Sequence, residues 1–575
     1  MPTLFLIPAR GGSKGLPQKN LALLGGIPLV GRTARVAHAV TAHFGGGCRT
    51  ICSTDDPRIA EIARIWGAEV PFLRPEELAA DETPTIEVVR HALAVLGETW
   101  SEVVLLQPTS PLVEPEDVIG ALLLFRETGG PVVSVCAAEH PVEWYFRIEA
   151  KGRLSRVLQE EGTIRRQLSR PAFRPNGAIY IASPDQVRAG GFITEDSRAF
   201  VMPSERSLDI DGAVDLEIAA SLLASKHISP IEIAQRRIGP GYPCFIIAEA
   251  GVNHNGDVKI AHRLVDEAAE AGADAVKFQT FRAERLAVRD APTPDYQLRA
   301  GLRESQFEML RRLELSAADH AALVARCRER NILFLSTPFD EGSCDLLESL
   351  DVPALKMASG ELTNTGLLRH AARTGKPLIV STGMSTMREV ARAFDTIREA
   401  GNRELALLHC VSNYPANPVD ANLKALVSLR EAFNVPTGFS DHTEGMAVAL
   451  AAVALGACIL EKHLTLDRSL PGPDHLSSIE PGEFREFVHA VRAVEAALGD
   501  GRKAPAAAEG PIAIAARKSL VAASFISRGA VLTPAMVVLL RPGTGLASEL
   551  LESLIGRRVA RDIQPGTLLK PEMFE

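Results

Sequence analysis

The stretch CFIIAEAGVNHNG, Cys244–Gly256, is an apolar run that ends in polar residues, and this pattern recurs through the middle of the chain. The seven further segments that show it are AVKFQTF (275–281), ILFLSTPFD (332–340), ALKMASGEL (354–362), PLIVSTGMS (377–385), LALLHCVSNYP (405–415), PTGFSDHT (436–443) and CILEKHLT (458–465). Helical patterns separate the segments. Eight βα units within about 260 residues predict a TIM barrel, with its active site at the C-terminal ends of the strands.

The polar residues at the strand ends would meet on one face of this barrel. That face would gather Glu249, Asn253, Lys277, Gln279, Thr337, Lys356, Ser359, Glu361, Ser381, Ser412, Asp441, His442 and His463. A barrel whose residues served only stability would not need polar groups at the same end of every strand. The pattern therefore predicts a catalytic site on this face.

Two histidines and two lysines suggest what this face binds. His442 and His463 end the last two predicted strands, and paired strands lie about 4.8 Å apart. One histidine there would more often be a core or capping residue, but two on adjacent strands can share a divalent metal ion that acts as a Lewis acid on a carbonyl group. Lys277 and Lys356 point into the same mouth. A buried lysine is unfavourable unless it meets an anion, which favours a phosphorylated substrate.

The first part of the chain alternates strand-like runs, such as TLFLIPA (3–9) and EVVLLQPTS (102–110), with amphipathic helical stretches. This alternation predicts an α/β domain with a mostly parallel sheet, whose ligands bind beyond the carboxyl ends of the strands. The loop IPARGGSKGLPQKN, Ile7–Asn20, lies at such an end. Its spacing fits neither the Walker P-loop nor the dinucleotide fingerprint.

This loop carries the groups that bind a polyphosphate. Its three glycines, Gly11, Gly12 and Gly15, let backbone N–H groups approach an anion closely. The cationic side chains suited to a triphosphate are Arg10, Lys14 and Lys19. A glycine-rich loop on its own is equally compatible with a plain turn.

A pair of acidic residues further along the chain favours nucleotide chemistry. In LDIDGAVD (208–215), Asp209 and Asp211 are two residues apart, so in an extended segment both carboxylates lie on one face. Paired carboxylates that face a triphosphate are a natural Mg²⁺ site. Alone they would more often form a solvated loop, but together with the glycine-rich loop they predict nucleotidyl transfer.

Two stretches without periodic patterns divide the chain into domains. We expect a first domain at residues 1–225, a linker at 226–241, the barrel at 242–500, a second linker at 501–514 and a small β-rich module at 515–575. The second linker is rich in alanine, glycine and proline. The last segment has short strands broken by turns and is too small for an independent enzyme.

Composition narrows the class of protein. The 575 residues exceed what one hydrophobic core supports, and the net charge of −9 argues against a nucleic-acid partner. The eight cysteines are scattered without a C-x-x-C motif, which favours a reducing compartment. We see neither a signal-peptide pattern nor an apolar run of about 18 residues, so we expect a soluble, cytoplasmic protein without membrane partners.

The first domain resembles the bacterial CMP-sialic acid synthetases (acylneuraminate cytidylyltransferases), and the expected fold is a Rossmann-like nucleotidyltransferase α/β domain. The motifs that carry the resemblance are, in order, IPARGGSKGLPQKN, STDD (53–56), QPTSP (107–111), FRPNGAIYI (173–181) and LDIDGAVDLE (208–217). It implies that CTP is bound by Arg10, Ser13, Lys14, Lys19, Asn20, Gln107 and Thr109, with Arg10 and Lys19 catalytic. Arg166, Gln167 and Tyr180 would lie near the acyl sugar, and Asp209 and Asp211 would bind Mg²⁺.

The barrel resembles the sialic acid synthase family, which condenses phosphoenolpyruvate with an N-acylated mannosamine-type sugar. The eight strand motifs and PGPDHLSS (471–478) carry the resemblance. It implies that His442 and His463 bind Mn²⁺ or a similar metal, and that phosphoenolpyruvate is surrounded by Lys277, Thr337, Lys356, Ser359, Ser381 and Ser440. The residues implied to engage the sugar or to transfer protons are Glu249, Gln279, Glu361 and Asp474, with Glu249, Lys277, Lys356, Glu361 and Asp474 as the catalytic set.

One position in the barrel departs from the family pattern. HCVSNYPA has Ser412 where some sialic acid synthases carry asparagine. This variant also resembles enzymes for legionaminic-type acids. Ser412 remains a candidate substrate-binding residue, and the departure leaves the identity of the sugar open.

The C-terminal segment resembles the antifreeze-like (SAF) domain of these synthases, a small β-clip fold, through ARKSL (516–520), RPGTG (541–545) and LIGRRVARDIQPGTLL (554–569). In that family the domain caps the barrel of the partner subunit. The resemblance implies a homodimer or higher homo-oligomer in which Arg541 reaches the N-acyl group of the sugar in the neighbouring barrel. From the sequence alone, an exposed loop arginine is the simpler interpretation of Arg541.

The combined resemblances imply a bifunctional enzyme that makes N-acetylneuraminate from phosphoenolpyruvate and N-acetylmannosamine and activates it with CTP. One alternative keeps both reactions but uses a legionaminic-type diacylated sugar. A more distant one makes the barrel a synthase of an eight-carbon keto sugar acid, against which EKHLT (461–465) and the tail argue. A scaffold with inactive modules is disfavoured because the lysines, histidines and paired aspartates are all present.

Overall fold

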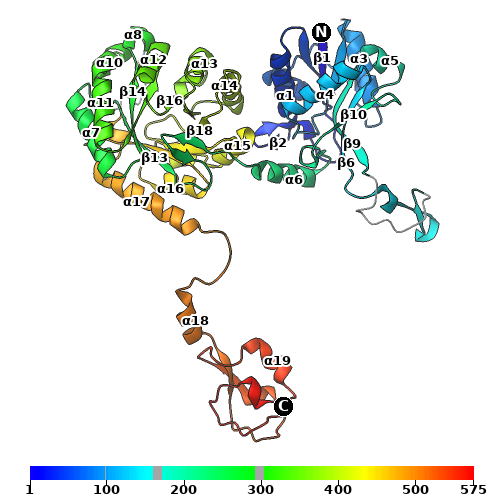
Figure 1. Cartoon of the computed structure of the whole chain (residues 1–575), viewed down its shortest axis with the longest axis vertical. Coiled ribbons are helices and arrows are strands. Elements are labelled where there is room, and N and C mark those ends of the chain that lie inside the picture. The colour runs from blue at the N-terminus through cyan, green and yellow to red at the C-terminus, as the bar shows by residue number, and fades with distance from the viewer. Residues whose placement is uncertain (98, 159–170, 290, 292–303) are drawn as a thin grey trace. The chain divides into compact units, whose positions relative to one another are not determined.

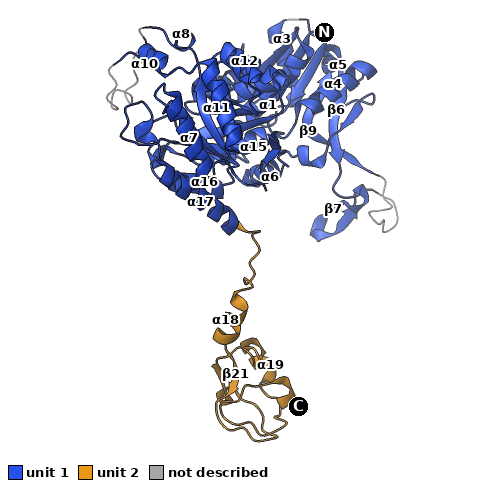
Figure 2. Ribbon diagram, turned by 60° about the vertical axis from the view of Figure 1, so that its left-hand side comes forward, with its two compact units in different colours: residues 1–497 blue, residues 498–575 orange. Residues whose placement is uncertain are grey.

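The computed structural model describes residues 1–97, 99–158, 171–289, 291 and 304–575 (Figure 1). These residues form two compact units, Met1–Ala497 and Leu498–Glu575, coloured separately in Figure 2. The first unit contains the α/β sheet and the barrel. The second contains the C-terminal module.

The N-terminal sheet has six strands in the order β10-β6-β9-β5-β1-β4. They are β1 (Thr3–Pro8), β4 (Cys48–Ser53), β5 (Glu102–Leu106), β6 (Val132–Ala137), β9 (Phe173–Ala182) and β10 (Arg198–Val201). Strand β9 runs antiparallel to both of its neighbours, and the other pairs are parallel. The predicted mostly parallel α/β sheet is confirmed.

Helices cover both faces of this sheet. One apolar cluster joins it to α1 (Leu29–Phe44) and α4 (Pro115–Thr128), and another joins it to α3 (Thr85–Leu96) and α5 (Pro184–Ala189). The remaining elements are α2 (Pro57–Ile65), α6 (Ala213–Ala224), the hairpin β2–β3 (Leu23–Leu24, Ile27–Pro28) and the projecting ribbon β7–β8 (Phe146–Ile148, Leu154–Arg156).

The predicted TIM barrel is confirmed as a closed ring of eight parallel strands in chain order. They are β13 (Phe245–Gly251), β14 (Ala275–Thr280), β15 (Leu333–Pro338), β16 (Leu355–Met357), β17 (Leu378–Ser381), β18 (Leu405–Cys410), β19 (Thr437–Asp441) and β20 (Ile459–His463). The ring closes through parallel pairing of β13 with β20.

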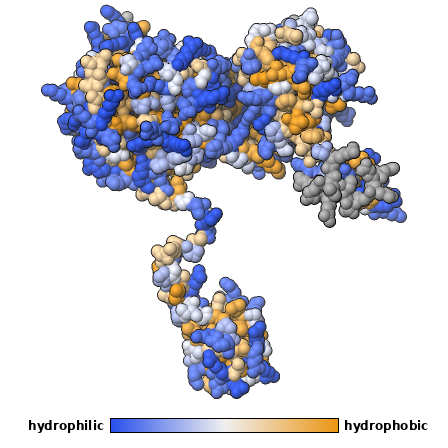
Figure 3. Space-filling view, in the orientation of Figure 1, coloured by the Kyte–Doolittle hydropathy of each residue, from blue (hydrophilic) through white to orange (hydrophobic). Residues whose placement is uncertain are grey.

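Ten described helices follow the strands of the barrel. They are α7 (Val258–Glu270), α8 (Ala283–Leu286), α10 (Gln306–Leu313), α11 (Ala317–Glu329), α12 (Glu341–Ser349), α13 (Thr365–Arg373), α14 (Met387–Glu399), α15 (Lys424–Phe433), α16 (Ala447–Ala454) and α17 (Pro481–Leu498). Polar residues dominate the face of the barrel seen in Figure 3, as expected for amphipathic helices whose apolar stripe faces the strands.

The alternation of side chains along each strand determines which residues face the barrel interior. In β13, Ile246 and Ala248 pack outward against the helices, whereas Phe245 and Ile247 belong to the interior cluster. Glu249 continues the inward series at the C-terminal end of the strand. The same period of two places the polar ends of β14 and β20 inside the barrel.

A short antiparallel ribbon closes the opposite, N-terminal end of the barrel. Its strands are β11 (Ile231–Ile233) and β12 (Arg236–Ile238). Ile231, Ile233 and Ile238 belong to the same apolar cluster as the inward residues of the barrel strands. The segment that we expected to be a linker, 226–241, therefore includes a packed element, which the alternating isoleucines explain.

The C-terminal unit has a small apolar core formed by Leu520, Ala522, Ile526, Leu532, Leu554, Val559, Ile563, Leu569 and Met573. Its regular elements are α18 (Glu509–Ala516), β21 (Ser519–Ala522), β22 (Val537–Leu540) and α19 (Leu551–Leu554). Isolated bridges link the turns. The expected compact β-rich module is confirmed. Across the described parts of the chain, every helix is too short or too polar to cross a membrane.

Candidate active sites

A cavity of about 430 Å³ opens at the C-terminal end of the barrel. The residues that we predicted to form this site share its wall: Glu249, Lys277, Gln279, Thr337, Lys356, Ser359, Glu361, Ser381, Ser412, Ser440, His442, His463 and Asp474. The structure thus brings these thirteen predicted residues together on one cavity. Strand ends supply most of them, and Asp474 comes from the segment after β20.

Buried lysines and carboxylates alternate across the floor of the cavity. The Lys277 ammonium lies 2.6 Å from Glu249 Oε2 and 3.6 Å from Glu461 Oε2. The Lys356 ammonium lies 3.6 Å from Glu461 Oε1. Lys277 also donates to Thr337 Oγ1 (3.1 Å), and Lys356 donates to Ser381 Oγ (2.6 Å). Cations flanked by hydroxyl groups match a phosphate monoester.

The pKa values of the two carboxylates in this network, Glu249 and Glu461, are shifted in opposite directions. Burial raises the pKa of Glu249 to about 7, although Lys277 favours the ionised form. Burial also opposes ionisation of Glu461, but Lys277 and Lys356 outweigh it and lower its pKa to about 2. Glu249 is therefore poised to exchange a proton near neutral pH, whereas Glu461 remains a fixed anion.

Glu461 was not among the predicted site residues, although it lies beside the predicted metal ligands in the sequence. The period of two along β20 could have identified Glu461 as a cavity residue. Ile459, Glu461 and His463 point inward and alternate with outward-facing residues. Ser440 Oγ donates to Glu461 Oε1 (2.7 Å). Cys410, which also lines the cavity, carries the same signal because it continues the inward series of Ala406 and Leu408 along β18. Tyr414 lies beyond the end of that strand and had no such signal.

The two predicted metal ligands lie side by side in the cavity wall, at the ends of the paired strands β19 and β20. The ring centroids of His442 and His463 are 5.5 Å apart, with the Tyr414 ring 4.3 Å from His442 and 5.7 Å from His463. His442 Nδ1 lies 2.7 Å from the Val411 carbonyl oxygen, which can only accept a hydrogen bond. This contact places the proton on Nδ1 and leaves the Nε2 lone pair available to a metal.

The electrostatics of this pair also suit a metal ion. Burial lowers the pKa of His442, and burial together with His442 lowers that of His463 well below the usual value, so both rings are neutral at pH 7. The buried His463 Nδ1 has no hydrogen-bond partner and lies 4.0 Å from Asp474 Oδ2. In the part of the chain that the structure describes, no group of three or more His, Cys, Asp or Glu residues is arranged to hold a metal ion. Two neutral imidazoles on one cavity wall, with the His442 Nε2 lone pair and the unpartnered His463 Nδ1, are donors that fit a divalent metal with open positions.

Two strand-end residues do not line the cavity, contrary to expectation. Asp441 lies on the same side of β19 as Phe439, which packs outward, and it pairs with the buried Lys462 ammonium at 2.7 Å. The Asn253 amide nitrogen donates to the Leu464 carbonyl oxygen at 2.9 Å. Both residues brace the loops above the strands instead of facing the cavity.

In the N-terminal domain, the glycine-rich loop packs directly against the segment that carries the paired aspartates. A Cβ atom on Gly15 would lie 2.3 Å from the Asp211 carbonyl oxygen, so only glycine fits there. The Lys19 ammonium donates to the Ile210 carbonyl oxygen (2.7 Å) and lies 3.4 Å from Asp211 Oδ1. Asn20 Nδ2 donates to the Arg10 carbonyl oxygen (2.9 Å). These contacts fix the loop beside both carboxylates.

The paired aspartates differ in their surroundings. Burial raises the pKa of Asp209, the Asp211 charge raises it further, and a hydrogen bond from Thr109 opposes both. Asp209 Oδ1 is buried without a partner, whereas Asp211 is exposed. The Asp209 charge also adds to the effect of burial in raising the pKa of Tyr180. A divalent cation would satisfy the free oxygen and neutralise both carboxylates, so the residues present fit Mg²⁺.

A third acidic residue, Asp81, engages the cations of the loop. It lies 2.7 Å from the Arg10 guanidinium and 2.6 Å from the Lys14 ammonium. Nothing in its sequence context identified it. Ser13 lies between these cations in the chain. A triphosphate bound by Arg10 and Lys14 would replace Asp81 as their anionic partner.

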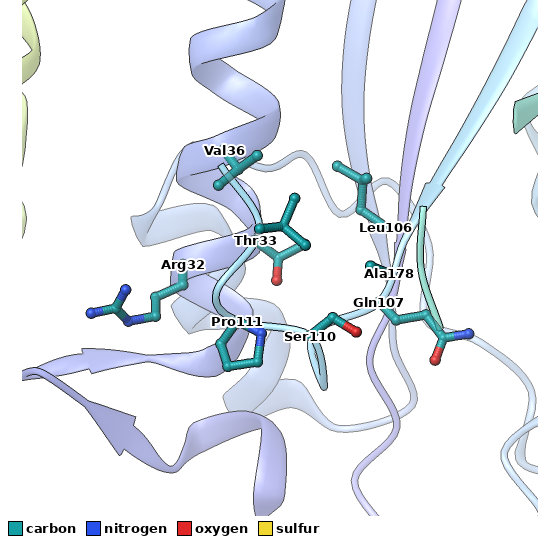
Figure 4. Close-up of a pocket in the computed structure, with 9 residues that line it drawn as sticks. Arg32, Thr33, Val36, Leu106, Gln107, Ser110, Pro111 and Ala178 are labelled. Carbon is teal, nitrogen blue, oxygen red and sulfur yellow. The ribbon is translucent and has the colours of Figure 1, made fainter. Parts of the chain in front are cut away.

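The remaining predicted residues, in the N-terminal domain and in the C-terminal unit, are placed as follows. Gln107 lines a small cavity of about 10 Å³ beside Arg32 and Ser110, shown in Figure 4. Arg166 and Gln167 lie outside the described residues. Arg541 follows β22 in the C-terminal unit and is exposed there.

Comparison with known proteins identifies each part of the chain. Residues 4–143 match the cytidylyltransferase family, residues 264–503 the NeuB family and residues 517–575 the SAF domain. An N,N'-diacetyllegionaminic acid synthase of Legionella pneumophila is 46% identical over 342 residues, which are 59% of this chain and 96% of the relative.

Two further relatives span the same region. An N,N'-diacetyllegionaminic acid synthase of Campylobacter jejuni is 41% identical over 328 residues, which are 56% of this chain and 98% of that protein. An N-acetylneuraminate-9-phosphate synthase of Mus musculus is 36% identical over 342 residues, 59% of this chain and 95% of that protein. The resemblances stated for all three domains are thereby confirmed, as is the expectation of an enzyme with a synthase and a cytidylyltransferase part. The chain belongs to the NeuB family, with a cytidylyltransferase domain before the barrel and a SAF domain after it.

Proposed function

We propose that this chain makes and activates a nine-carbon 2-keto sugar acid in two steps. In the barrel, C3 of phosphoenolpyruvate attacks the aldehyde of an N-acylated mannosamine-type sugar, water adds at C2, and phosphate leaves. In the N-terminal domain, the anomeric hydroxyl of the product attacks the α-phosphate of CTP, giving the CMP-sugar and pyrophosphate. The observation that carries the first step is the convergence of two buried lysines and two neutral histidines on one cavity.

Each group at the barrel mouth has a defined task in this proposal. Lys277 and Lys356 bind the phosphate and carboxylate of phosphoenolpyruvate, assisted by hydroxyls of Thr337, Ser359, Ser381, Ser412 and Ser440. A divalent cation such as Mn²⁺, held by His442 and His463, would supply Lewis-acid polarisation of the sugar aldehyde. Glu249 and Asp474, whose pKa values burial raises to about 7 and about 6, exchange protons with the sugar hydroxyls, near Gln279 and Glu361.

In the N-terminal domain, the loop cations Arg10, Lys14 and Lys19 bind the triphosphate after Asp81 releases the first two. Mg²⁺ held by Asp209 and Asp211 would neutralise the departing pyrophosphate. Ser13, Asn20, Gln107 and Thr109 complete the proposed nucleotide site, and Tyr180 lies on the sugar side.

For the sugar itself, we favour a 2,4-diacetamido-trideoxy mannose-type substrate over N-acetylmannosamine. The diacetyllegionaminic relatives share 46% and 41% identity with this chain, against 36% for the N-acetylneuraminate-9-phosphate synthase. The cavity wall also includes the apolar side chains of Met309, Leu310 and Leu313, which suit an additional acetyl group. N-acetylmannosamine, the substrate that the sequence motifs put first, remains the second candidate.

Phosphate release distinguishes the two sugars. With phosphoenolpyruvate and Mn²⁺, we expect kcat/KM to be about tenfold or more higher for the diacetamido sugar, because the methyl of its added acetyl group is worth about 1–3 kcal/mol in a matching apolar pocket. A reaction without sugar is the control for hydrolysis of phosphoenolpyruvate. Equal or higher kcat/KM with N-acetylmannosamine would assign the chain to N-acetylneuraminate synthesis instead.

The C-terminal unit has a separate place in the proposal. Its membership of the SAF family supports a role in covering the barrel of a second copy, with Arg541 directed to the acyl group of the sugar. The homo-oligomer, the exact domain boundaries and the cytoplasmic location all remain predictions.

A further inference from the structure

A second large cavity, of about 390 Å³, lies within the first unit, away from both proposed catalytic sites. Its wall is shared between the N-terminal domain and the barrel. The N-terminal side consists of Arg35 and His38 of α1 together with Ile65 and Trp66 at the end of α2. The barrel side consists of residues from α13 and α14.

The barrel side of this cavity is lined by arginines. Arg388 and Arg392 are four residues apart on α14 and therefore share one face of that helix, and Arg369 lies on α13. None of these three arginines forms a salt bridge with any residue that the structure describes. Glu389 is an electrostatic neighbour of Arg388, but its carboxylate accepts the backbone and hydroxyl hydrogen bonds of Thr386.

The carboxylates in the wall do not balance these charges. Asp395 is engaged by Arg35, whose guanidinium donates to both of its oxygens at 2.7 and 3.2 Å. Glu399 is the other acidic residue of the lining. Three unpaired guanidinium groups against one free carboxylate leave the cavity positively charged.

Two further features define the kind of anion that would fit. Thr365 lines the cavity as the first residue of the nine-residue helix α13, so the positive end of the helix borders it. On the opposite side, the partly buried Trp66 and Ile65 provide an aromatic and aliphatic wall. A charged side for phosphate and an aromatic side for a ring system together match a nucleotide.

We propose that this cavity is a binding site for a phosphate-bearing ligand of the nucleoside phosphate class. The phosphate lies on Arg369, Arg388 and Arg392, and the base lies against Trp66. The site is distinct from the proposed CTP site and does not depend on either proposed reaction. Because its wall comes from both catalytic domains, ligand bound there contacts both of them.

The test uses Trp66 as a local reporter in the full chain. CMP and, separately, inorganic pyrophosphate are titrated while tryptophan emission is followed, and the signal of Trp66→Phe is subtracted. We expect a saturable change that weakens about tenfold or more in Arg388→Ala/Arg392→Ala, since each charged hydrogen bond is worth about 1.5–3 kcal/mol. The matched control is Arg373→Ala/Arg403→Ala, which removes two exposed arginines outside the cavity and should bind as the unmodified chain does.

The two probes separate the sources of phosphate. A response to CMP, with or without one to pyrophosphate, supports a nucleotide site, and a response to pyrophosphate alone would replace the nucleotide with an inorganic anion. No saturable Trp66 signal with either probe would overturn the proposal. So would equal affinity in the cavity variant and the control, with circular dichroism verifying that both are folded.

Discussion

Replacing His442 with alanine is expected to lower the rate of condensation by about a thousandfold or more while cytidylyl transfer proceeds at the unmodified rate. The imidazole is one of two neutral imidazoles that line the barrel cavity and are proposed to hold the metal, and its tautomer is fixed by the Val411 carbonyl oxygen. Lewis-acid stabilisation of a developing charge is worth several kcal/mol, and each 1.36 kcal/mol is tenfold in rate. Phosphate release and CMP-sugar formation from supplied sugar acid measure the two activities.

The controls for His442→Ala address the metal and the fold separately. Removal of divalent metal by chelation should stop condensation in the unmodified chain, and added Mn²⁺ should restore it there but not in the variant. His370→Ala, which removes a histidine of α13 that pairs with Asp345 of α12, should retain both activities. Loss of both activities in a folded His442→Ala variant would refute the independence of the two domains.

The Asp211→Ala substitution is expected to produce the converse pattern, with cytidylyl transfer reduced by about a hundredfold or more and condensation unchanged. Asp211 is exposed and lies beside the glycine-rich loop, so its removal affects cation binding more than folding. Charge stabilisation by a bound divalent cation is again worth several kcal/mol. Initial rates of pyrophosphate release, measured over a range of Mg²⁺ concentrations, test this expectation.

A raised Mg²⁺ requirement in Asp211→Ala would support a direct role in holding the cation. Glu217→Gln, an exposed acidic position on α6, removes the same charge without approaching the loop and should behave as the unmodified chain. Unchanged pyrophosphate release in Asp211→Ala would exclude that residue from the site and leave Asp209, with its buried unpartnered oxygen, as the residue to examine.

Much of the barrel site was predictable because successive side chains along a strand point alternately into and out of the barrel. A residue such as Glu249 or His463 continues an inward-facing apolar series, so its position in the strand determines its direction. The closed barrel then brings residues far apart in sequence to one mouth. The expectation for Asp441 was wrong because it rested only on the position at a strand end. Asp441 is two residues after Phe439, which packs outward, so its side chain lies on the outer side of the strand as well.

Other features depend on contacts that no local pattern encodes. Asp81 meets Arg10 and Lys14 through a loop remote in sequence, and the arginine-lined cavity requires α1 and α2 to meet α13 and α14. The ribbon of Ile231–Ile233 and Arg236–Ile238 had a readable alternation, but proline and glycine on either side obscured it. Tertiary packing determines the first two features, whereas the ribbon was locally encoded.

The two-step proposal is tested by a single reaction of the purified full chain with phosphoenolpyruvate, CTP, Mg²⁺, Mn²⁺ and the diacetamido sugar, followed by mass spectrometry. We predict a CMP-linked nine-carbon sugar acid, formed with equal amounts of phosphate and pyrophosphate. Accumulation of free sugar acid with CTP unconsumed, or consumption of neither phosphoenolpyruvate nor CTP, would contradict the account.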